Sequence, residues 1–330
     1  MKTRKSLTIT VLGGGAWGTA LSIMAANLQH NVCLYLRDCK NAEIINTKRR
    51  NSRYFPEIVL PDTITATADQ QDALSIADLV MVVVPAQVLA KALVSFAPFV
   101  STKIPLILCC KGIDSPSGRF MSEIARDIFP KNSIATLSGP GFAADVAKGL
   151  PTAVTIAASD ERLSINLAYM LSGPLFRCYV STDVIGVEVG GALKNVMALA
   201  AGMVAGQKLG ASAQAAIITR GFAELRKIGR KLGGQEETMT GLSVLGDLIL
   251  TCSSPLSRNY AYGIALGTGK QIDSSLLAEG VATAPVAANL CKKHNIDAPI
   301  ISTVAAILAG HVSINAAVRT FVTRPLKFED

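Results

Sequence analysis

The pattern of hydrophobic and polar positions changes once along the chain. Up to about Ser181, apolar runs alternate with segments whose apolar residues have helical spacing. The runs predict strands, the first four almost continuously apolar, at 7–12, 32–36, 79–84, 105–109, 133–137, 153–157 and 177–181. The segments between them predict helices at 19–28, 86–97, 120–129 and 143–148. Because continuous apolar runs are typical of parallel strands buried on both faces, this part predicts a doubly wound α/β sheet.

Beyond about Gly186 the strand pattern stops. Helical spacing, with frequent Ala, Leu and Met, predicts helices at 191–205, 211–232, 256–266, 282–294 and 300–309. We therefore expect a Rossmann-like domain over residues 1–186 and an all-helical domain over residues 187–330.

A glycine-rich motif follows the first predicted strand. Residues 13–18, GGGAWG, match the pattern G-x-G-x-x-G and precede a predicted helix. Gly13 would permit the tight turn, Gly15 would let the backbone approach a pyrophosphate, and Gly18 would allow the helix to pack closely on the strand. The motif in this setting predicts a dinucleotide cofactor.

The second predicted strand ends at Arg37 and Asp38, where a residue that contacts the cofactor ribose is expected. An Arg there can pair with a 2′-phosphate and favours NADPH, whereas an Asp can hold a 2′-hydroxyl and favours NADH. We expect NADPH, with tolerance of NADH. Either residue could instead be a solvated loop charge.

Other candidate ligand contacts follow later strands. Lys111 follows the strand that ends in Cys109-Cys110, and ligands of open α/β sheets bind outside the carboxyl ends of strands. The segment 138–153, SGPGFAADVAKGLPTA, again gives a strand, a Gly-Pro turn and a helix start, whose backbone N–H groups could contact a substrate or cofactor. A solvated lysine and a plain connector are the alternatives.

The stretch 241–259, GLSVLGDLILTCSSPLSRN, predicts a phosphate site. Ser254 before Pro255 is a helix-start signal, which would place Ser257, Arg258 and Asn259 in the first helical turn. Unpaired N–H groups and the positive end of the helix dipole attract anions there, and a guanidinium fits phosphate oxygens. A capped helix with a solvated Arg is the simpler alternative.

A lysine in an apolar helical segment is the candidate acid–base group. Lys194 lies in GGALKN, 190–195, where a charge costs free energy unless it is paired or used. Reduction of a carbonyl leaves an alkoxide that must be protonated, and none of the three histidines has a suitable context. Burial and a second cation, Lys111, would lower the pKa of Lys194, while Asp247 could orient it. The alternative is a lysine that reaches solvent at the helix edge.

Composition narrows the classes of partner. The net charge of +8 comes without a long basic run or an aromatic-plus-basic stripe, so it suits a small acidic substrate rather than nucleic acid. The seven cysteines lack C-x-x-C spacing and are expected to be reduced core thiols, and no histidine cluster suggests a metal. The glycines at 13–15 interrupt the apolar N-terminal segment, so we do not expect a signal peptide. The apolar stretch 79–90 is too short for a membrane span and 299–318 is diluted by polar residues, so we do not expect an integral membrane protein.

Taken together, the motifs resemble one family. GGGAWGTA, CKGI, SGPGFA, GGALKNV, ITRGFAE, GLSVLGDLILTC, SRN and AEGVATA occur in the order typical of the bacterial NAD(P)-dependent glycerol-3-phosphate dehydrogenases, over residues 7 to about 299. The resemblance implies reduction of dihydroxyacetone phosphate to sn-glycerol 3-phosphate for glycerophospholipid synthesis, with NADP(H) or NAD(H). It also implies a cytoplasmic enzyme that forms a homodimer.

The resemblance also implies residue roles. Lys194 becomes the proton donor and acceptor, with Lys111 and Asp247 beside it. The remaining substrate contacts that it implies are Gly139, Gly141, Ser257, Arg258 and Asn259. The cofactor contacts that it implies are Gly13, Gly15, Ala16, Trp17, Gly18, Arg37, Lys111, Ala143, Arg258, Leu277 and Glu279.

Three positions depart from the family pattern. Gly141 stands where a Ser or Thr is usual, so a hydroxyl contact to substrate is absent or replaced by backbone. Trp17 stands where an aromatic residue is usual, which is a mild change. Leu277 and Ala278 replace the usual valines, which weakens the assignment of Leu277.

The same residues leave two other functions open. A related β-hydroxyacid dehydrogenase would act on a carboxylate, but such relatives tend to separate the Lys and Asn that are adjacent here at 194–195. A binding protein that senses NADPH without catalysis would have no reason to keep Lys194, Asp247 and Arg258 together.

Overall fold

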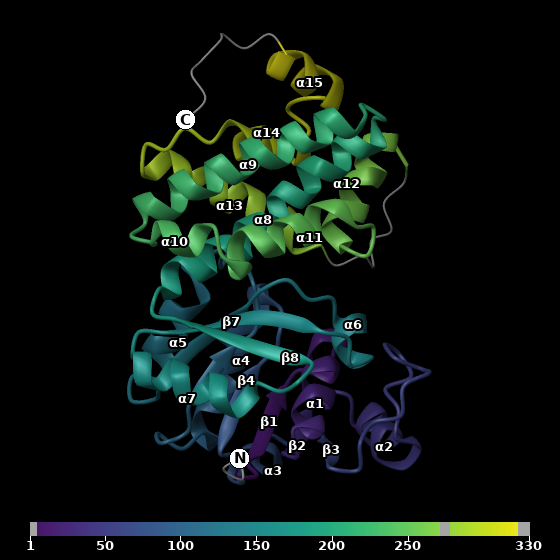
Figure 1. Cartoon of the computed structure of the whole chain (residues 1–330), viewed down its shortest axis with the longest axis vertical. Coiled ribbons are helices and arrows are strands. Elements are labelled where there is room, and N and C mark those ends of the chain that lie inside the picture. The colour runs from purple at the N-terminus through teal and green to yellow at the C-terminus, as the bar shows by residue number, and fades with distance from the viewer. Residues whose placement is uncertain (1–4, 271–277, 323–330) are drawn as a thin grey trace. The chain divides into compact units, whose positions relative to one another are not determined.

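The structure is a computed structural model that describes residues 5–270 and 278–322, and it divides into two compact units (Figure 1). The first unit contains Met1–Lys111 and Phe120–Val184, and the second contains Gly112–Arg119 and Ile185–Asp330. The main division of the chain therefore falls after Val184. The assignment of Gly112–Arg119 to the second unit had no signal in the sequence.

The first unit is built on an eight-stranded sheet with the order β3-β2-β1-β4-β5-β6-β7-β8. Pairing is parallel from β3 to β6, antiparallel between β6 and β7, and parallel between β7 and β8. The strands are β1 (Thr8–Leu12), β2 (Asn31–Tyr35), β3 (Ile64–Thr67), β4 (Leu79–Val82), β5 (Leu106–Leu108), β6 (Ile134–Ser138), β7 (Thr152–Ala158) and β8 (Phe176–Ser181). The predicted doubly wound sheet is confirmed. Only β3, a four-residue edge strand that alternates Ile and Ala with Thr, had not been predicted.

Helices cover both faces of this sheet, as the crossovers of parallel strands require. They are α1 (Ala16–Asn27), α2 (Cys39–Lys48), α3 (Gln70–Ser75), α4 (Leu89–Phe96), α5 (Met121–Ile128), α6 (Ala143–Ala147) and α7 (Glu161–Leu171), with 3₁₀ turns η1 (Ala86–Val88) and η2 (Ala97–Phe99). Successive residues of a strand point to opposite faces of the sheet and so belong to two separate hydrophobic cores. Leu79 and Met81 of β4 pack under α1 and α2, whereas Val80 and Val82 pack under α4 and α5.

The described part of the second unit is all helical, as predicted. Its elements are α8 (Val184–Gly206), α9 (Ala211–Lys231), α10 (Glu236–Met239), η3 (Leu242–Gly246), α11 (Asp247–Ser253), α12 (Arg258–Thr268), α13 (Glu279–Lys293), α14 (Pro299–Leu308) and α15 (Ile314–Val322). Helix α8 begins seven residues before the predicted start at 191. Its first two turns are rich in Val and Gly, which have low helix propensity, so packing in this unit rather than local preference forms them.

The backbones of helices α8 and α12 are in direct contact, with no side chain between them at the crossing. A Cβ atom placed on Gly202 would lie 2.2 Å from the carbonyl oxygen of Tyr260, and one on Gly263 would lie 2.3 Å from that of Leu199. Gly206 and Gly267 repeat the contact one turn later. Because only glycine has no Cβ, these paired glycines allow the close crossing that places the start of α12 beside the middle of α8.

Helix α8 is also long and apolar enough to cross a membrane by length and composition. Among the described helices one further pair, Glu236–Ser253 with Arg258–Thr268, passes the same test as a single span bent by 43°. The most apolar window of α8 is 94% buried inside the protein. A buried core helix of this kind accounts for the hydropathy without a membrane.

Replacement of Gly263 by Ala tests the crossing. Helix propensity alone would make this variant more stable by about 1 kcal/mol. The collision with the Leu199 carbonyl predicts the opposite sign, a loss of about 1–3 kcal/mol in the free energy of unfolding. Urea denaturation measures it. Gly221→Ala is the matched control, because its new methyl group would meet mainly the flexible Met197 side chain, and a loss as large as in Gly263→Ala would contradict the account.

Candidate active site

The glycine turn of the first unit has the geometry predicted for a dinucleotide loop. Gly13 has φ 128°, and a Cβ there would lie 2.5 Å from the carbonyl oxygen of Val83. A Cβ on Gly18 would lie 1.8 Å from the carbonyl oxygen of Gly13, so α1 rests directly on the turn. Gly15, by contrast, has nothing within 4 Å of an added Cβ. The turn therefore leaves open backbone at Gly15 and Ala16, at the start of a helix, and can hold a pyrophosphate.

Trp17 and the second glycine turn lie next to each other. A Cβ placed on Gly141 would be 3.6 Å from the Trp17 ring and 3.2 Å from Cγ2 of Thr152. The space that a Ser or Thr would need is thus already narrow, which gives a steric reason for glycine at this departure from the family pattern. Ala143 begins α6, which packs against α1.

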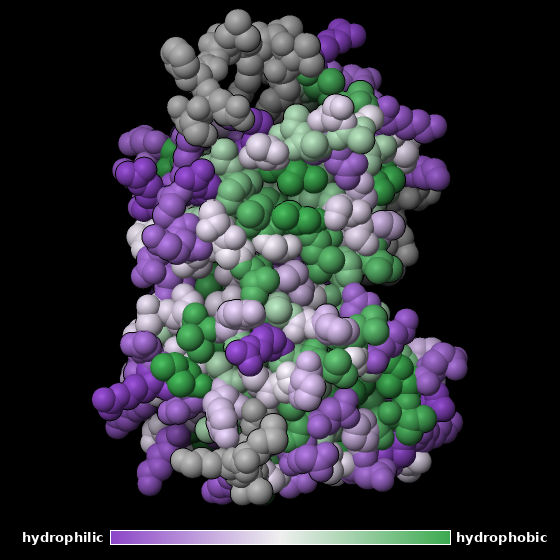
Figure 2. Space-filling view, in the orientation of Figure 1, coloured by the Kyte–Doolittle hydropathy of each residue, from purple (hydrophilic) through white to green (hydrophobic). Residues whose placement is uncertain are grey.

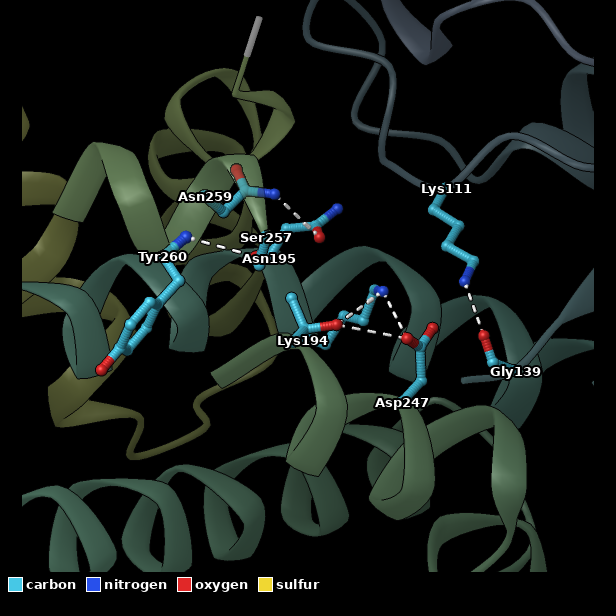
Figure 3. Close-up of polar contacts among 9 residues, drawn as sticks. Lys111, Gly139, Lys194, Asn195, Asp247, Ser257, Asn259 and Tyr260 are labelled. Atoms are coloured by element: carbon cyan, nitrogen blue, oxygen red, sulfur yellow. Dashed lines mark hydrogen bonds and ion pairs between the residues drawn. The ribbon is translucent and has the colours of Figure 1, made fainter. Parts of the chain in front are cut away.

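Lys111 lies at the same edge of the sheet as the glycine turn. The parallel strands β1, β2, β5 and β6 end just before Gly13, Arg37, Lys111 and Gly139, so all four residues follow carboxyl ends. Lys111 Nζ donates to the Gly139 carbonyl oxygen at 3.2 Å (Figure 3). Gly139 has φ 153°, and a Cβ there would lie 2.7 Å from Val154 Cα, so no other residue fits this turn.

Arg37 and Asp38, the two candidates for contact with the cofactor ribose, differ in their contacts within the protein. Asp38 is the N-cap of α2, and its carboxylate accepts from the Asn41 backbone N–H at 3.2 Å. Arg37 is exposed, and no hydrogen bond or ion pair to it occurs among the described residues. Asp38 therefore has a structural role in the chain itself, while Arg37 is available to a ligand.

Lys194 is the centre of a buried polar cluster in the second unit (Figure 3). Its Nζ lies 2.6 Å from Oδ1 of Asp247 and 2.9 Å from Oγ1 of Thr251, which in turn donates to the same Asp247 oxygen at 3.2 Å. Lys194 is 7% exposed and Asp247 1% exposed. The predicted pairing of Lys194 with Asp247 is thus present, and Thr251 joins it without having been predicted.

A turn of π-helix places Asp247 opposite Lys194. This turn, η3, ends at Gly246, and Asp247 begins α11 directly after it. Val244 of the turn packs on α8, where a Cβ on Gly190 would lie only 2.4 Å from its Cγ2. Gly190 therefore lets η3 approach one turn before Lys194. π-Helical turns are uncommon and often occur at functional sites.

The phosphate-site prediction was wrong about where its helix begins. Ser254 ends α11, and Ser254-Pro255 forms a turn in which Ser257 N–H donates to the Ser254 carbonyl at 3.0 Å. The N-cap of α12 is Ser257, whose Oγ accepts from the Tyr260 backbone N–H at 3.3 Å. Proline can occupy a turn as readily as a helix start, because both accept its fixed φ. Arg258 is exposed in the first turn of α12, so the predicted anion site remains at a helix N-terminus.

Asn259 connects three helices. Its Nδ2 donates to Oδ1 of Asn195 at 3.0 Å, and its Oδ1 accepts from the Gly280 backbone N–H at 2.9 Å. Asn195 follows Lys194 on α8, and Gly280 follows Glu279 at the start of α13. This buried network holds the starts of α12 and α13 against α8 near Lys194. Leu277, also predicted to contact the cofactor, lies outside the described residues.

Two thiols near these sites, Cys109 and Cys252, are buried. Burial raises the pKa of Cys252 to about 12, against the opposing effect of the Lys194 charge. Burial raises the pKa of Cys109 further still, although Lys111 lies nearby. A thiol with so high a pKa is almost entirely protonated at neutral pH, so Cys109 and Cys252 are core residues.

An open sheet with a glycine-rich turn after its first strand, followed by a helical unit that holds a buried lysine, defines the class of NAD(P)-dependent dehydrogenases. Comparison with known proteins narrows this class. The family model for the NAD-dependent glycerol-3-phosphate dehydrogenase N-terminus matches residues 8–164, and that for its C-terminus matches residues 183–319. The chain belongs to the NAD-dependent glycerol-3-phosphate dehydrogenase family.

Individual relatives agree over the whole length. Glycerol-3-phosphate dehydrogenase [NAD(P)+] of Brucella canis is 55% identical over 325 residues, which cover 98% of this chain and 100% of that protein. The protein of the same name from a Chelativorans species is 52% identical over 98% of both chains. The crystal structure of glycerol-3-phosphate dehydrogenase from Coxiella burnetii superimposes with a TM-score of 0.91 at 33% identity, covering 97% of this chain and 99% of that one.

Removal of Asp247 tests the burial of Lys194. Asp247→Ala leaves an ammonium with its carboxylate partner gone, and we expect a loss of about 3–5 kcal/mol in the free energy of unfolding. The double variant Lys194→Met, Asp247→Leu removes both charges and should recover most of that loss. Denaturant titrations of the three proteins measure it. A double variant less stable than Asp247→Ala would show that the pair itself, and not the unpaired charge, decides stability.

Proposed function

We propose that the protein reduces dihydroxyacetone phosphate to sn-glycerol 3-phosphate, reversibly, with NADPH or NADH. Family membership over the whole chain supports the reaction, and the buried Lys194–Asp247–Thr251 cluster is the observation that carries it. The product would feed glycerophospholipid synthesis. The carboxylate-directed alternative is not favoured, because the Brucella canis and Chelativorans relatives, each more than 50% identical, are named glycerol-3-phosphate dehydrogenases.

Lys194 would supply the proton in this reaction. Reduced nicotinamide, when bound, supplies a hydride to the ketone carbon, and the carbonyl oxygen becomes an alkoxide. Lys194 Nζ would give that oxygen a proton, and in the reverse direction take it back. Asp247 and Thr251 fix the position of Nζ through their hydrogen bonds, so the proton donor is aimed before the substrate arrives.

The start of α12 would bind the substrate phosphate. Ser257 and Arg258 occupy the N-cap and the first position of an eleven-residue helix, where backbone N–H groups and the dipole favour an anion. Arg258 adds a charged planar donor. Asn259 would hold this helix start in place through Asn195 and Gly280. From the first unit, Lys111, Gly139 and Gly141 are proposed to contact the substrate.

The first unit would hold the cofactor. Gly13 and Gly18 form the turn, and Gly15, Ala16 and Trp17 would border the pyrophosphate. Arg37 would pair with a 2′-phosphate, because it is exposed and Asp38 is used as a helix cap. Lys111, Ala143, Arg258, Leu277 and Glu279 are proposed as the remaining cofactor contacts on the family resemblance.

A cytoplasmic homodimer is the proposed state of the enzyme. Figure 2 shows apolar residues gathered on the face of the helical unit that is turned to the viewer. Large exposed apolar areas are uncommon on monomers and often mark interfaces, which supports association of two copies. Sedimentation velocity would distinguish dimer from monomer.

Activity and the Lys194→Ala variant test the proposal together. The wild-type protein should oxidise NADPH rapidly, followed by absorbance, when dihydroxyacetone phosphate is added. Lys194→Ala should lower kcat by about 10²–10⁴-fold, because the alkoxide loses its proton donor. The variant should still bind NADPH with wild-type affinity. Near-normal turnover in Lys194→Ala would remove the assigned role, and a carboxylate that outperforms the triose phosphate would change the substrate class.

The Arg37→Ala variant tests the ribose assignment. Loss of a bidentate pair to a 2′-phosphate should raise the KM for NADPH by about 10–100-fold. The KM for NADH, which has no such phosphate, should change less than about threefold. Steady-state kinetics with each cofactor measure the two effects. Equal losses with both cofactors would show that Arg37 does not recognise the 2′-phosphate.

A further inference from the structure

A buried asparagine outside the glycine motif bonds to the centre of the glycine turn. Asn51 is 0% exposed and lies in the loop that follows α2. Its Nδ2 donates to the Gly14 carbonyl oxygen at 3.1 Å and to Oγ1 of Thr19, in α1, at 2.9 Å. Both N–H bonds of the amide are therefore used, one on the turn and one on the helix that follows it.

The loop around Asn51 is held in place from both ends. The Asn51 carbonyl oxygen accepts from the backbone N–H groups of Tyr54, at 3.1 Å, and Phe55, at 2.8 Å. The Arg49 guanidinium donates to the carbonyl oxygens of Pro61 and Ile64, which lie at the far end of the loop. Asn51 thus reaches the glycine turn from a fixed position rather than from a loose surface loop.

The bond to Gly14 determines the direction of the next N–H group. No peptide bond among the described residues is cis, so the Gly14 carbonyl and the Gly15 N–H point in opposite directions. With the carbonyl turned towards Asn51, the Gly15 N–H points away from it. No described residue accepts from this N–H, and a Cβ on Gly15 would meet nothing within 4 Å. The N–H is therefore available to a ligand at the start of α1.

We infer that Asn51 is a positioning residue for cofactor binding, which turns the Gly14–Gly15 peptide so that an N–H group, and not a carbonyl oxygen, meets the pyrophosphate. The inference rests on the proposed use of NADPH or NADH. A carbonyl oxygen on that side would repel the anion, whereas an N–H forms a charge-assisted hydrogen bond with it. Without Asn51 the Gly14 carbonyl loses this hydrogen-bond partner, and the peptide can rotate.

The test measures cofactor affinity directly. Trp17 is the single tryptophan of the chain and lies two residues after Gly15, so its fluorescence reports NADPH binding in the absence of substrate. Asn51→Ala should raise the Kd of NADPH by about 10–100-fold, the loss of about one charge-assisted hydrogen bond. The Kd of 2′-AMP, which has no pyrophosphate and competes for the adenosine end, should change less than about threefold. In turnover, KM for NADPH should rise while kcat changes little.

Asn132→Ala is the matched control. Asn132 also donates both amide N–H bonds to two carbonyl oxygens of a loop, those of Ser101 and Ile104, at 2.8 and 2.9 Å. It lies just before β6, at the amino-terminal ends of the parallel strands, whereas the glycine turn lies at their carboxyl ends. Asn132→Ala should lower the melting temperature, although less than Asn51→Ala because Asn132 is only partly buried, and it should leave the NADPH Kd unchanged.

Several outcomes would overturn the inference. An unchanged NADPH Kd in folded Asn51→Ala would do so, as would equal losses for NADPH and 2′-AMP, which would indicate general damage to the unit. If Asn51→Ala does not fold, wild-type protein labelled with ¹⁵N-glycine gives the answer. The Gly15 amide proton should shift downfield with NADPH and not with 2′-AMP, and an unmoved resonance would refute the inference. Because these measurements need no turnover, they remain valid if the proposed reaction is wrong.

Discussion

Backbone segments in both units lie closer together than any side chain would allow. In the first unit, α1 sits on the carbonyl of Gly13 because Gly18 has no Cβ; in the second, α8 and α12 cross through Gly202 and Gly263. Each approach does the same work, since it brings the N-terminus of a helix to a place where an anion can bind. In both units a helix start is thus held in place by glycine packing, and under the proposed function each start would bind a phosphate group.

The buried charge of Lys194 is a second constraint on the fold, because it needs polar partners inside the protein. An ammonium inside an apolar helix needs a carboxylate and hydrogen-bond acceptors within reach, and these come from α11 rather than from α8 itself. That need explains the π-helical turn before Asp247 and the missing side chain at Gly190, which together let α11 come close. Stability and the proposed proton transfer by Lys194 therefore depend on the same contact, so this region has little freedom to change without loss of both.

The features that could be predicted from the sequence are those set by residues close together in the chain. The turn at 13–18 and the helix around Lys194 were predictable because a glycine pattern or a misplaced charge is visible locally. Thr251, Asn195 and Asn51 were not singled out as contacts, because their partners are far away in sequence and an isolated polar residue gives no signal. The start of α12 was misplaced for a related reason. Ser-Pro suits both a turn and a helix start, and the packing of α11 and α12 decides between them.

The position of α8 in the chain matters during translation, because the helices that pack on it are made after it. This helix is apolar almost throughout, and the helices that cover it, up to α14, lie on the C-terminal side over about 100 more residues. At about 5–20 residues per second, a ribosome needs about 5–20 s to make them. During that interval the emerging chain carries an uncovered segment that resembles a membrane span. The helix that holds the lysine in the finished protein is therefore also an apolar stretch of the nascent chain that stays uncovered until the helices that pack on it have been made.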